Sequence, residues 1–179
     1  MTRVLMYATA ACPFCQSAER LLVGKGVQIE KIYVKDVSLE IPNAPQIFMQ
    51  QAQPQLEVRI DTGAAPFSEG YFEASVSATV TAKVGDKTLF LAEAVQAGIF
   101  QMRNVPADDL KPLLGIACPT ILFPYLRETI SDLVIRGGFP PVLLAPVSFE
   151  ALYVQRLQQE QSAAPGGASP EGPRIEVAR

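Results

Sequence analysis

The chain has 179 residues, of which 49% are hydrophobic and 18% are charged, so it is long enough and apolar enough for one well-buried domain. The net charge of −3 argues against nucleic acid as the main partner, because phosphate binding needs clustered lysine and arginine. Histidine is absent, which excludes Ser-His-Asp and Cys-His catalysis, and three cysteines cannot supply the roughly four ligands of a structural zinc site. We therefore expect neither a metal nor another cofactor.

The sequence also predicts where the protein works. No apolar run reaches the roughly 18 residues that cross a bilayer, so direct membrane insertion is not expected. The N-terminal apolar run over residues 4–7 is too short for a signal peptide. Two of the three cysteines share one Cys-x-x-Cys motif, which is not the framework of a secreted disulfide-rich protein. These features predict a cytoplasmic protein.

The first elements along the chain surround a thiol motif. Residues 3–7 predict a short strand, and residues 14–23 predict a helix. Cys12 lies where that helix begins, so the partial positive charge of the helix N-terminus favours its thiolate. Cys15, one turn later, is placed to resolve a mixed disulfide.

This run, VLMYATAACPFCQSAERLLVGKGV, resembles the opening of a glutaredoxin. The resemblance implies a thiol-disulfide oxidoreductase in which Cys12 and Cys15 form the redox pair. It covers only residues 1–27, and neither the rest of a thioredoxin-like sheet nor the Gly-Gly turn for glutathione follows. Because a lone strand and helix cannot bury their apolar faces, an inherited extension without activity is the competing interpretation.

The middle of the chain predicts an antiparallel sheet. An extended run over 27–34 is followed by prolines, and a second run over 56–60 alternates apolar with charged residues. After an expected loop at 63–70, residues 71–84 place apolar side chains on one face and polar ones on the other, the period of a half-buried strand. Gly85-Asp86 then predicts a tight hairpin turn.

The returning strand, residues 88–100, is apolar on both faces. Leu89, Leu91, Val95 and Ile99 share one face, and Phe90, Ala92, Ala94 and Phe100 share the other. Two explanations remain open. Either the outer face of this strand meets another subunit, or the strand is a core strand covered by helices of its own chain.

Two helices are expected in the C-terminal half. The first begins at Pro124, which suits a first helical turn, runs to Arg136 and ends at Gly137-Gly138. Ser148 is a good N-cap for the second, which extends to about Gln161. The remaining residues, 162–179, are of low complexity and are predicted to be disordered.

Long segments between about Ile29 and Gln161 resemble SecB, the bacterial export chaperone. They are IYVKDVSLEIPNAPQIF, VTAKVGDKTLFLAE, QAGIF and CPTILFPYLRETISDLVIRGGFPPVLLAPVSFEALY, in that order. The resemblance implies an α+β fold, with a four-stranded antiparallel sheet, helices packed on one side, and assembly into a homotetramer that is a dimer of dimers. It divides the chain into a truncated glutaredoxin-like βα segment (1–27), a SecB-like domain (28–161) and a tail (162–179).

The same resemblance implies three sets of site residues. One set docks on SecA, the translocation ATPase, through an acidic sheet surface; a second faces a neighbouring subunit; a third lines a hydrophobic groove for unfolded precursors. They are Asp36, Glu40, Leu91 and Glu93 for SecA, Ala92, Ala94 and Gln96 for the tetramer interface, and Phe48, Val58, Ile60, Tyr125 and Phe139 for the groove.

The predicted function is therefore that of a cytoplasmic holdase rather than an enzyme. It would bind unfolded secretory precursors by non-directional apolar burial and deliver them to SecA. The alternative is a glutaredoxin-like oxidoreductase acting through the CPFC motif.

Overall fold

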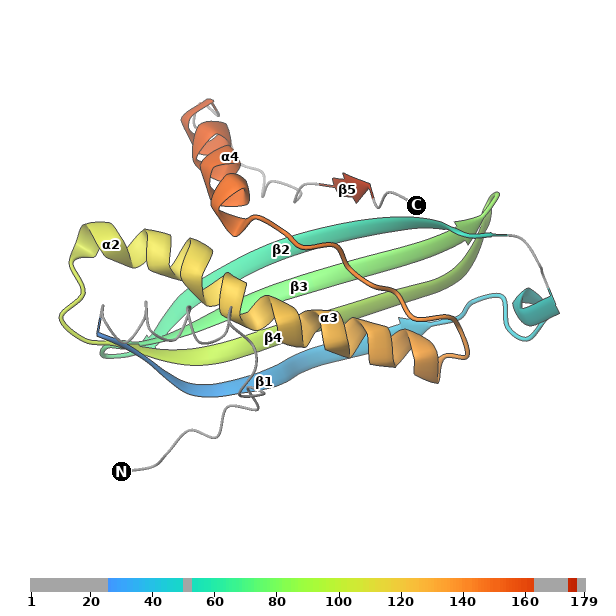
Figure 1. The fold of residues 1–179 in the computed structure, drawn as a ribbon, viewed down its shortest axis with the longest axis horizontal. Helices are drawn as coiled ribbons and strands as arrows, with labels where there is room; N and C mark the ends of the chain where they lie inside the picture. Colours follow the sequence, from blue (N-terminus) through green and yellow to red (C-terminus); the bar gives the residue numbers. More distant parts are fainter. Residues whose placement is uncertain (1–25, 50–52, 163–173, 177–179) are drawn as a thin grey trace.

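The computed structural model describes residues 26–49, 53–162 and 174–176, and their main feature is one antiparallel sheet (Figure 1). Its spatial order is β1-β4-β3-β2-β5. The four long strands are β1 (Val27–Glu40), β2 (Gln55–Ser68), β3 (Tyr71–Val84) and β4 (Lys87–Met102). They confirm the expected four-stranded antiparallel sheet.

The alternation of β3 is confirmed. Ala74, Val76 and Val80 of its apolar set are fully buried, Phe72 and Val84 at its two ends are partly buried, and the polar set faces the other side of the sheet. The hairpin turn at Gly85 is also confirmed, and Gly85 has a φ of 57°, which suits a residue without a Cβ.

The strands extend further than the sequence indicated. β1 continues to Glu40 because two irregularities in its pairing with β4, after Ile29 and after Val34, absorb extra residues without ending the ladder. β2 continues to Ser68, so most of the loop expected at 63–70 is strand, and only Glu69 and Gly70 form the turn into β3.

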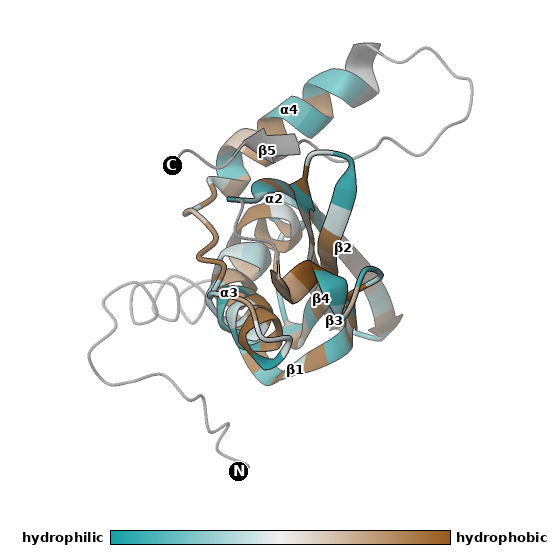
Figure 2. Cartoon of the chain, turned by 90° about the vertical axis from the view of Figure 1, so that its right-hand side faces the viewer, coloured by the Kyte–Doolittle hydropathy of each residue, from teal (hydrophilic) through white to brown (hydrophobic). Residues whose placement is uncertain are grey.

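The helices lie on one side of the sheet (Figures 1 and 2). They are α2 (Ala107–Pro112), the π-helical turn η2 (Leu113–Ala117), α3 (Cys118–Arg136) and α4 (Phe149–Ser162), with a 3-10 turn, η1 (Gln46–Met49), after β1. α3 packs against β4 and β3. Among the described residues, no helix covers the opposite face, which is called the open face below.

The predicted start of α3 is wrong. The helix begins six residues before Pro124, which lies inside it, and Pro119 occupies the first turn instead. A proline inside a helix removes one backbone hydrogen bond. Here the helix continues past it because Leu122 and Leu126, on either side of Pro124, are fully buried against the sheet.

Small residues of the sheet let α3 approach closely. Leu122, Leu126, Ile130 and Val134 recur every four residues, and all four are fully buried. Below them lie alanines of β3 and β4, and each is buried as well. A larger side chain at any of these alanines would push α3 away from the sheet.

A fifth strand, β5 (Arg174–Glu176), corrects the expectation of a wholly disordered tail. It pairs antiparallel with residues 57–59 of β2. The physical reason is that the outer edge of β2 would otherwise leave a row of backbone N–H and C=O groups unpaired, and an extended segment can satisfy them. Residues 163–173 and 177–179 of the tail lie outside the described residues.

Candidate functional site: the open face of the sheet and the aromatic end of α3

The four residues predicted to bind SecA lie on the open face of the sheet. In the pairing of β1 with β4, Glu40 lies opposite Leu91, and Glu93 and Asp36 follow along the same two strands. The carboxylates of Asp36, Glu40 and Glu93 are exposed, and Leu91 is half-buried. The sheet therefore brings these four residues together as one acidic surface with an apolar side chain inside it, which we call the acidic surface.

The acidic surface keeps its negative charge. Glu93 accepts a hydrogen bond of 3.0 Å from the Thr79 hydroxyl, a neutral donor that orients the carboxylate without cancelling its charge. Among the residues that the structure describes, no ion pair joins Asp36, Glu40 or Glu93 to a lysine or arginine. Exposed, uncompensated carboxylates attract a basic partner over a Debye length of about 8 Å at physiological salt.

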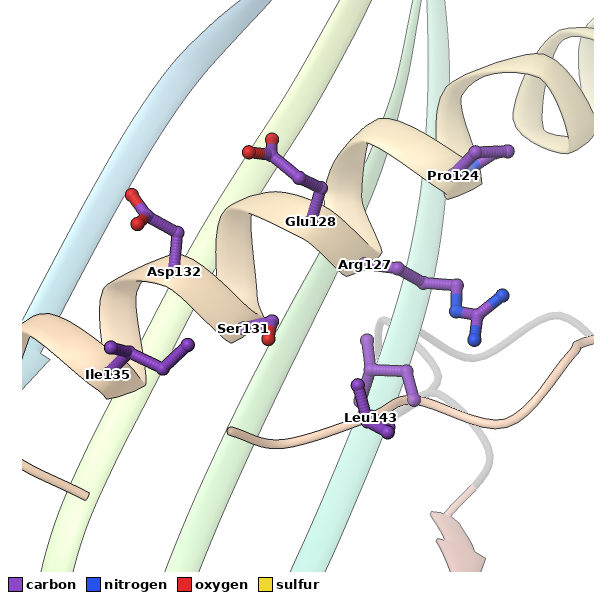
Figure 3. A pocket seen from close by; sticks show the side chains of 8 residues that line it. Pro124, Arg127, Glu128, Ser131, Asp132, Ile135 and Leu143 are labelled. Atoms are coloured by element: carbon purple, nitrogen blue, oxygen red, sulfur yellow. The ribbon is translucent and has the colours of Figure 1, made fainter. Parts of the chain in front are cut away.

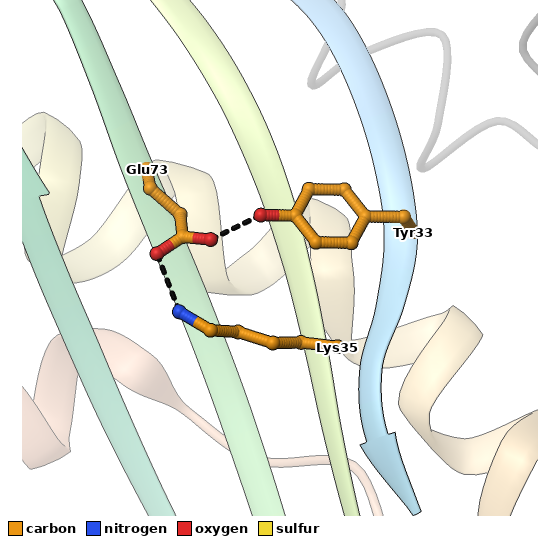
Figure 4. A network of polar contacts seen from close by, with 3 residues as sticks. All are labelled: Tyr33, Lys35 and Glu73. Carbon is orange, nitrogen blue, oxygen red and sulfur yellow. Dashed lines mark hydrogen bonds and ion pairs between the residues drawn. The ribbon is translucent and has the colours of Figure 1, made fainter. Parts of the chain in front are cut away.

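Beside the acidic surface, three residues form a polar network across β4 (Figure 4). Tyr33 and Lys35 on β1 both reach Glu73 on β3; the Lys35 Nζ lies 2.6 Å from Oε2, and the Tyr33 hydroxyl donates to Oε1. Lys35, and then Tyr33, hold the pKa of Glu73 below its usual range, and the bond to Glu73 raises the pKa of Tyr33 to about 12. No local sequence pattern indicates this network, because its members are about 40 residues apart and meet only through the strand order.

Replacing Glu73 with glutamine is expected to destabilise the protein at neutral pH but not in acid. A carboxylate whose folded pKa is lowered contributes stability above its unfolded pKa, and this contribution is lost as the pH falls through the folded value. Urea unfolding of both proteins, at neutral pH and at a pH below the lowered pKa of Glu73 in the folded protein, measures the difference. A gap between the two proteins that persists in acid would contradict the assignment.

The predicted interface residues do not face outward. Ala92, Ala94 and Gln96 are 0%, 1% and 3% exposed within a single chain, because they lie on the face of β4 that α3 covers. The Thr129 hydroxyl of α3 approaches the Gln96 side-chain oxygen at 3.4 Å. Within a single chain, this face of the apolar strand therefore follows the second explanation, a core face covered by the chain's own helix, while the assignment of these residues to the tetramer interface stays a prediction.

Two of the groove residues meet at the end of α3. The rings of Phe48 and Phe139 stack with centroids 5.2 Å apart, and Phe90 packs against Phe139 at 4.9 Å. Phe48 is 48% exposed, so this aromatic cluster reaches solvent. Phe90 belongs to this aromatic cluster, although the sequence predicts only its place on the returning strand. Its alternation with Ala92 and Ala94 indicates that it lies on the same face of β4 as these two residues.

The other groove residues lie elsewhere. Val58 and Ile60 are 3% and 2% exposed and belong to the hydrophobic core of the single chain, and their place in a client groove stays a prediction. The π-helical turn η2 contacts β2, and the segment that joins α3 to α4 supplies Val142 and Leu144 to the same core. Tyr125 is half-buried near the middle of α3, away from the end where Phe139 follows the helix.

An open cavity of about 460 Å³ lies between α3 and the segment after it (Figure 3). Its polar lining comes from α3, and its exposed apolar lining comes from Ile135 and Leu143. Arg127 points to the side of the helix where Leu143 lies, whereas Glu128 and Asp132 point to the other side. The charged groups thus point in different directions, whereas a small-molecule site has polar groups that converge on one point.

The cysteines divide into two groups. Cys118, at the start of α3, is free and fully buried, and desolvation raises the pKa of its thiol far above the usual range, so it is chemically inert. Cys12 and Cys15 lie outside the described residues. Within the described ranges, no cluster of three or more Cys, Asp or Glu side chains is placed to hold a metal ion, and none of the described helices is long and apolar enough to span a membrane.

These features define a class of protein. A broad acidic sheet face and a solvent-exposed aromatic cluster are the kinds of surface that suit other polypeptides. The comparisons with known proteins agree. The family model for the preprotein translocase subunit SecB matches residues 23–160, beginning after the Cys-x-x-Cys motif.

Relatives at high identity give the same result. The protein-export protein SecB of Chromobacterium violaceum is 59% identical over 135 residues, which is 75% of this chain and 90% of the relative. That of Methylobacillus flagellatus is 57% identical over 141 residues, covering 79% and 89%. The chain belongs to the SecB family of protein-export chaperones.

A solved structure matches the fold. A SecB-like chaperone of Mycobacterium tuberculosis, in complex with a peptide from an antitoxin, superposes with a TM-score of 0.60 at 18% identity, over 72% of this chain and 95% of that one. At this identity the likeness concerns the fold alone. None of these comparisons extends to a glutaredoxin.

Proposed function

We propose that this chain is a cytoplasmic holdase that keeps secretory precursors unfolded and passes them to SecA. The observation that carries the proposal is the gathering of Asp36, Glu40, Leu91 and Glu93 into one acidic surface on the uncovered face of the sheet. Carboxylates supply long-range attraction and orientation to a basic partner, and Leu91 adds apolar burial at the centre. Family membership supports the assignment.

Client binding is assigned to the aromatic end of α3. The Phe48–Phe139–Phe90 cluster offers exposed aromatic area without directional polar groups, which suits unfolded chains of many sequences. The related chaperone of Mycobacterium tuberculosis binds a peptide segment of another protein. Several weak contacts along one wrapped client would combine through effective concentration.

The working assembly we propose is a homotetramer, a dimer of dimers, in which residues 28–161 form the chaperone domain. Apolar area for contacts between chains comes from Ile135 on the exposed side of α3, from Leu143 in the segment after it, and from the exposed valines Val34 and Val37 on β1. Light scattering during size exclusion tests this directly. A mass of about four times the 19.4 kDa of one chain is expected, and a monomer at every concentration would contradict it.

Holdase activity is tested without a nucleotide. The protein should suppress light scattering from a reduced, unfolding client at stoichiometric amounts when no ATP is present. Aggregation at the rate of the client alone would reject the proposed function, since no enzymatic turnover is invoked.

Replacing Phe48 with alanine is expected to weaken client holding several-fold while changing the free energy of unfolding by less than about 1 kcal/mol, because half of this ring already faces water. The matched variant is Ile60→Ala, which should cost about 2–5 kcal/mol, since Ile60 is fully buried in the core. Client affinity by fluorescence anisotropy, together with urea unfolding, separates the two effects. Unchanged client affinity in the Phe48 variant would remove the aromatic cluster from the binding site.

A further inference from the structure

Lys35 is a cation of β1 that lies beside the acidic surface. It directly precedes Asp36, and the pairing of β1 with β4 is irregular between Val34 and Asp36, so Lys35 is the extra residue of a bulge. Its side chain is about half exposed, with a relative exposure of 49%. A lysine at this place has a long, mobile stem and would find Asp36 as its nearest carboxylate in sequence.

Lys35 is held by Glu73 instead. Its ammonium group lies 2.6 Å from one carboxylate oxygen of Glu73, and the Tyr33 hydroxyl donates to the other oxygen. Because both oxygens are engaged, the carboxylate is fixed in orientation, and its own side chain is only 25% exposed. Figure 4 shows Lys35 and Tyr33 reaching across β4 to Glu73.

We propose that Glu73 is a positioning residue for the acidic surface: it holds and neutralises Lys35, so that Asp36 and its neighbours present uncompensated negative charge to a basic partner. This inference rests on the proposed function, since it concerns the same docking surface. Tyr33 supports this role, because its hydrogen bond orients the Glu73 carboxylate that pairs with Lys35.

The charges of Lys35 and Glu73 determine whether each variant should weaken or restore SecA binding. The Lys35–Glu73 pair carries no net charge, and Glu73→Gln leaves one free cation next to Asp36. Removing both charges, in Lys35→Gln/Glu73→Gln, restores a neutral pair. Glu73→Gln should therefore weaken SecA binding by about three- to tenfold at low salt, and the double variant should restore it.

The test measures SecA binding by the full chain at low and high salt. Glu69→Gln is the matched control, because Glu69 is an exposed glutamate in the turn between β2 and β3, and its loss changes the net charge equally. The inference predicts a defect confined to Glu73→Gln, rescued in the double variant and reduced at high salt. A double variant as weak as Glu73→Gln would indicate a merely structural role for Glu73 and overturn the inference.

A second readout does not depend on SecA. Titration of the tyrosines by NMR should show the pKa of Tyr33 raised in the unaltered protein and returned towards the ordinary tyrosine value in Glu73→Gln. If the unaltered protein binds SecA but Glu73→Gln binds equally well although the Tyr33 pKa has fallen, only the inference is overturned. If the unaltered protein does not bind SecA, the proposed function fails, and the inference fails with it.

Discussion

Reversing the charge of Glu93, in Glu93→Lys, is expected to weaken SecA binding by roughly 10- to 100-fold while leaving client binding unchanged. Glu93 is exposed on the open face, diagonal to Glu40 and Asp36 across the β1–β4 ladder, and its carboxylate is oriented by Thr79. A lysine here removes one attractive charge and places a repulsive one at the centre of the acidic surface. The client-binding aromatic cluster includes Phe48 and Phe139, which lie outside the acidic surface.

The measurement is a pair of titrations on the same preparation, one with SecA and one with an unfolded client. Glu69→Lys is the matched control, since it makes the same charge reversal in the exposed turn between β2 and β3. Equal loss of both binding activities in Glu93→Lys would remove Glu93 from the docking surface, and equal loss in both variants would show that only the net charge of the protein matters.

Local patterns in the sequence predict the structure correctly where the geometry of a single strand or a single turn determines it. The alternation of β3 predicted its buried set because neighbouring side chains of a strand must point to opposite faces. Gly85 predicted the hairpin because few other residues accept its φ of 57°. The four residues of the acidic surface were named from the resemblance to SecB, not from a local pattern. The β1–β4 register brings them together on one face of the sheet.

Long-range packing decides the features that local patterns leave open. Val58 and Ile60 carry the same alternating signal whether their face is an open groove or a covered core, and Val142 and Leu144, which belong to the same core, come more than 80 residues later. The contact of Glu73 with Tyr33 likewise depends on β4 lying between their strands, which no local pattern states.

The predicted start of α3 was wrong for a related reason. Proline is strongly preferred in the first turn of a helix, so the local sequence alone predicts that the helix begins at Pro124. The burial of Leu122, Phe123 and Leu126 outweighs the hydrogen bond that Pro124 removes, so the helix runs on through it. Preference for a helix end is thus a local quantity, whereas the length of α3 is set by the length of sheet that it covers.

Replacing Ala94 with leucine is expected to lower the free energy of unfolding by about 1–3 kcal/mol and to reduce the assembly to smaller species. Ala94 is 1% exposed between β4 and α3, so three extra carbons have no room unless α3 moves outward. In the proposed tetramer the outer side of α3 contributes contacts between chains, and its displacement would misplace them. Because Ala94 is buried beneath α3 within one chain, the effect on assembly is expected to travel through α3.

Val95→Leu is the control on the open face: it enlarges, by one carbon, the next residue of β4, which faces the open side of the sheet, opposite Asp36. Light scattering gives the mass of the assembly, and hydrogen exchange reports the protection of α3 in each variant. Loss of mass together with faster exchange in α3, seen in the Ala94 variant alone, is the expected result. Loss of mass with α3 still fully protected would mean that Ala94 meets the neighbouring subunit directly, and the burial of this face by the chain's own helix would then not describe the assembled protein.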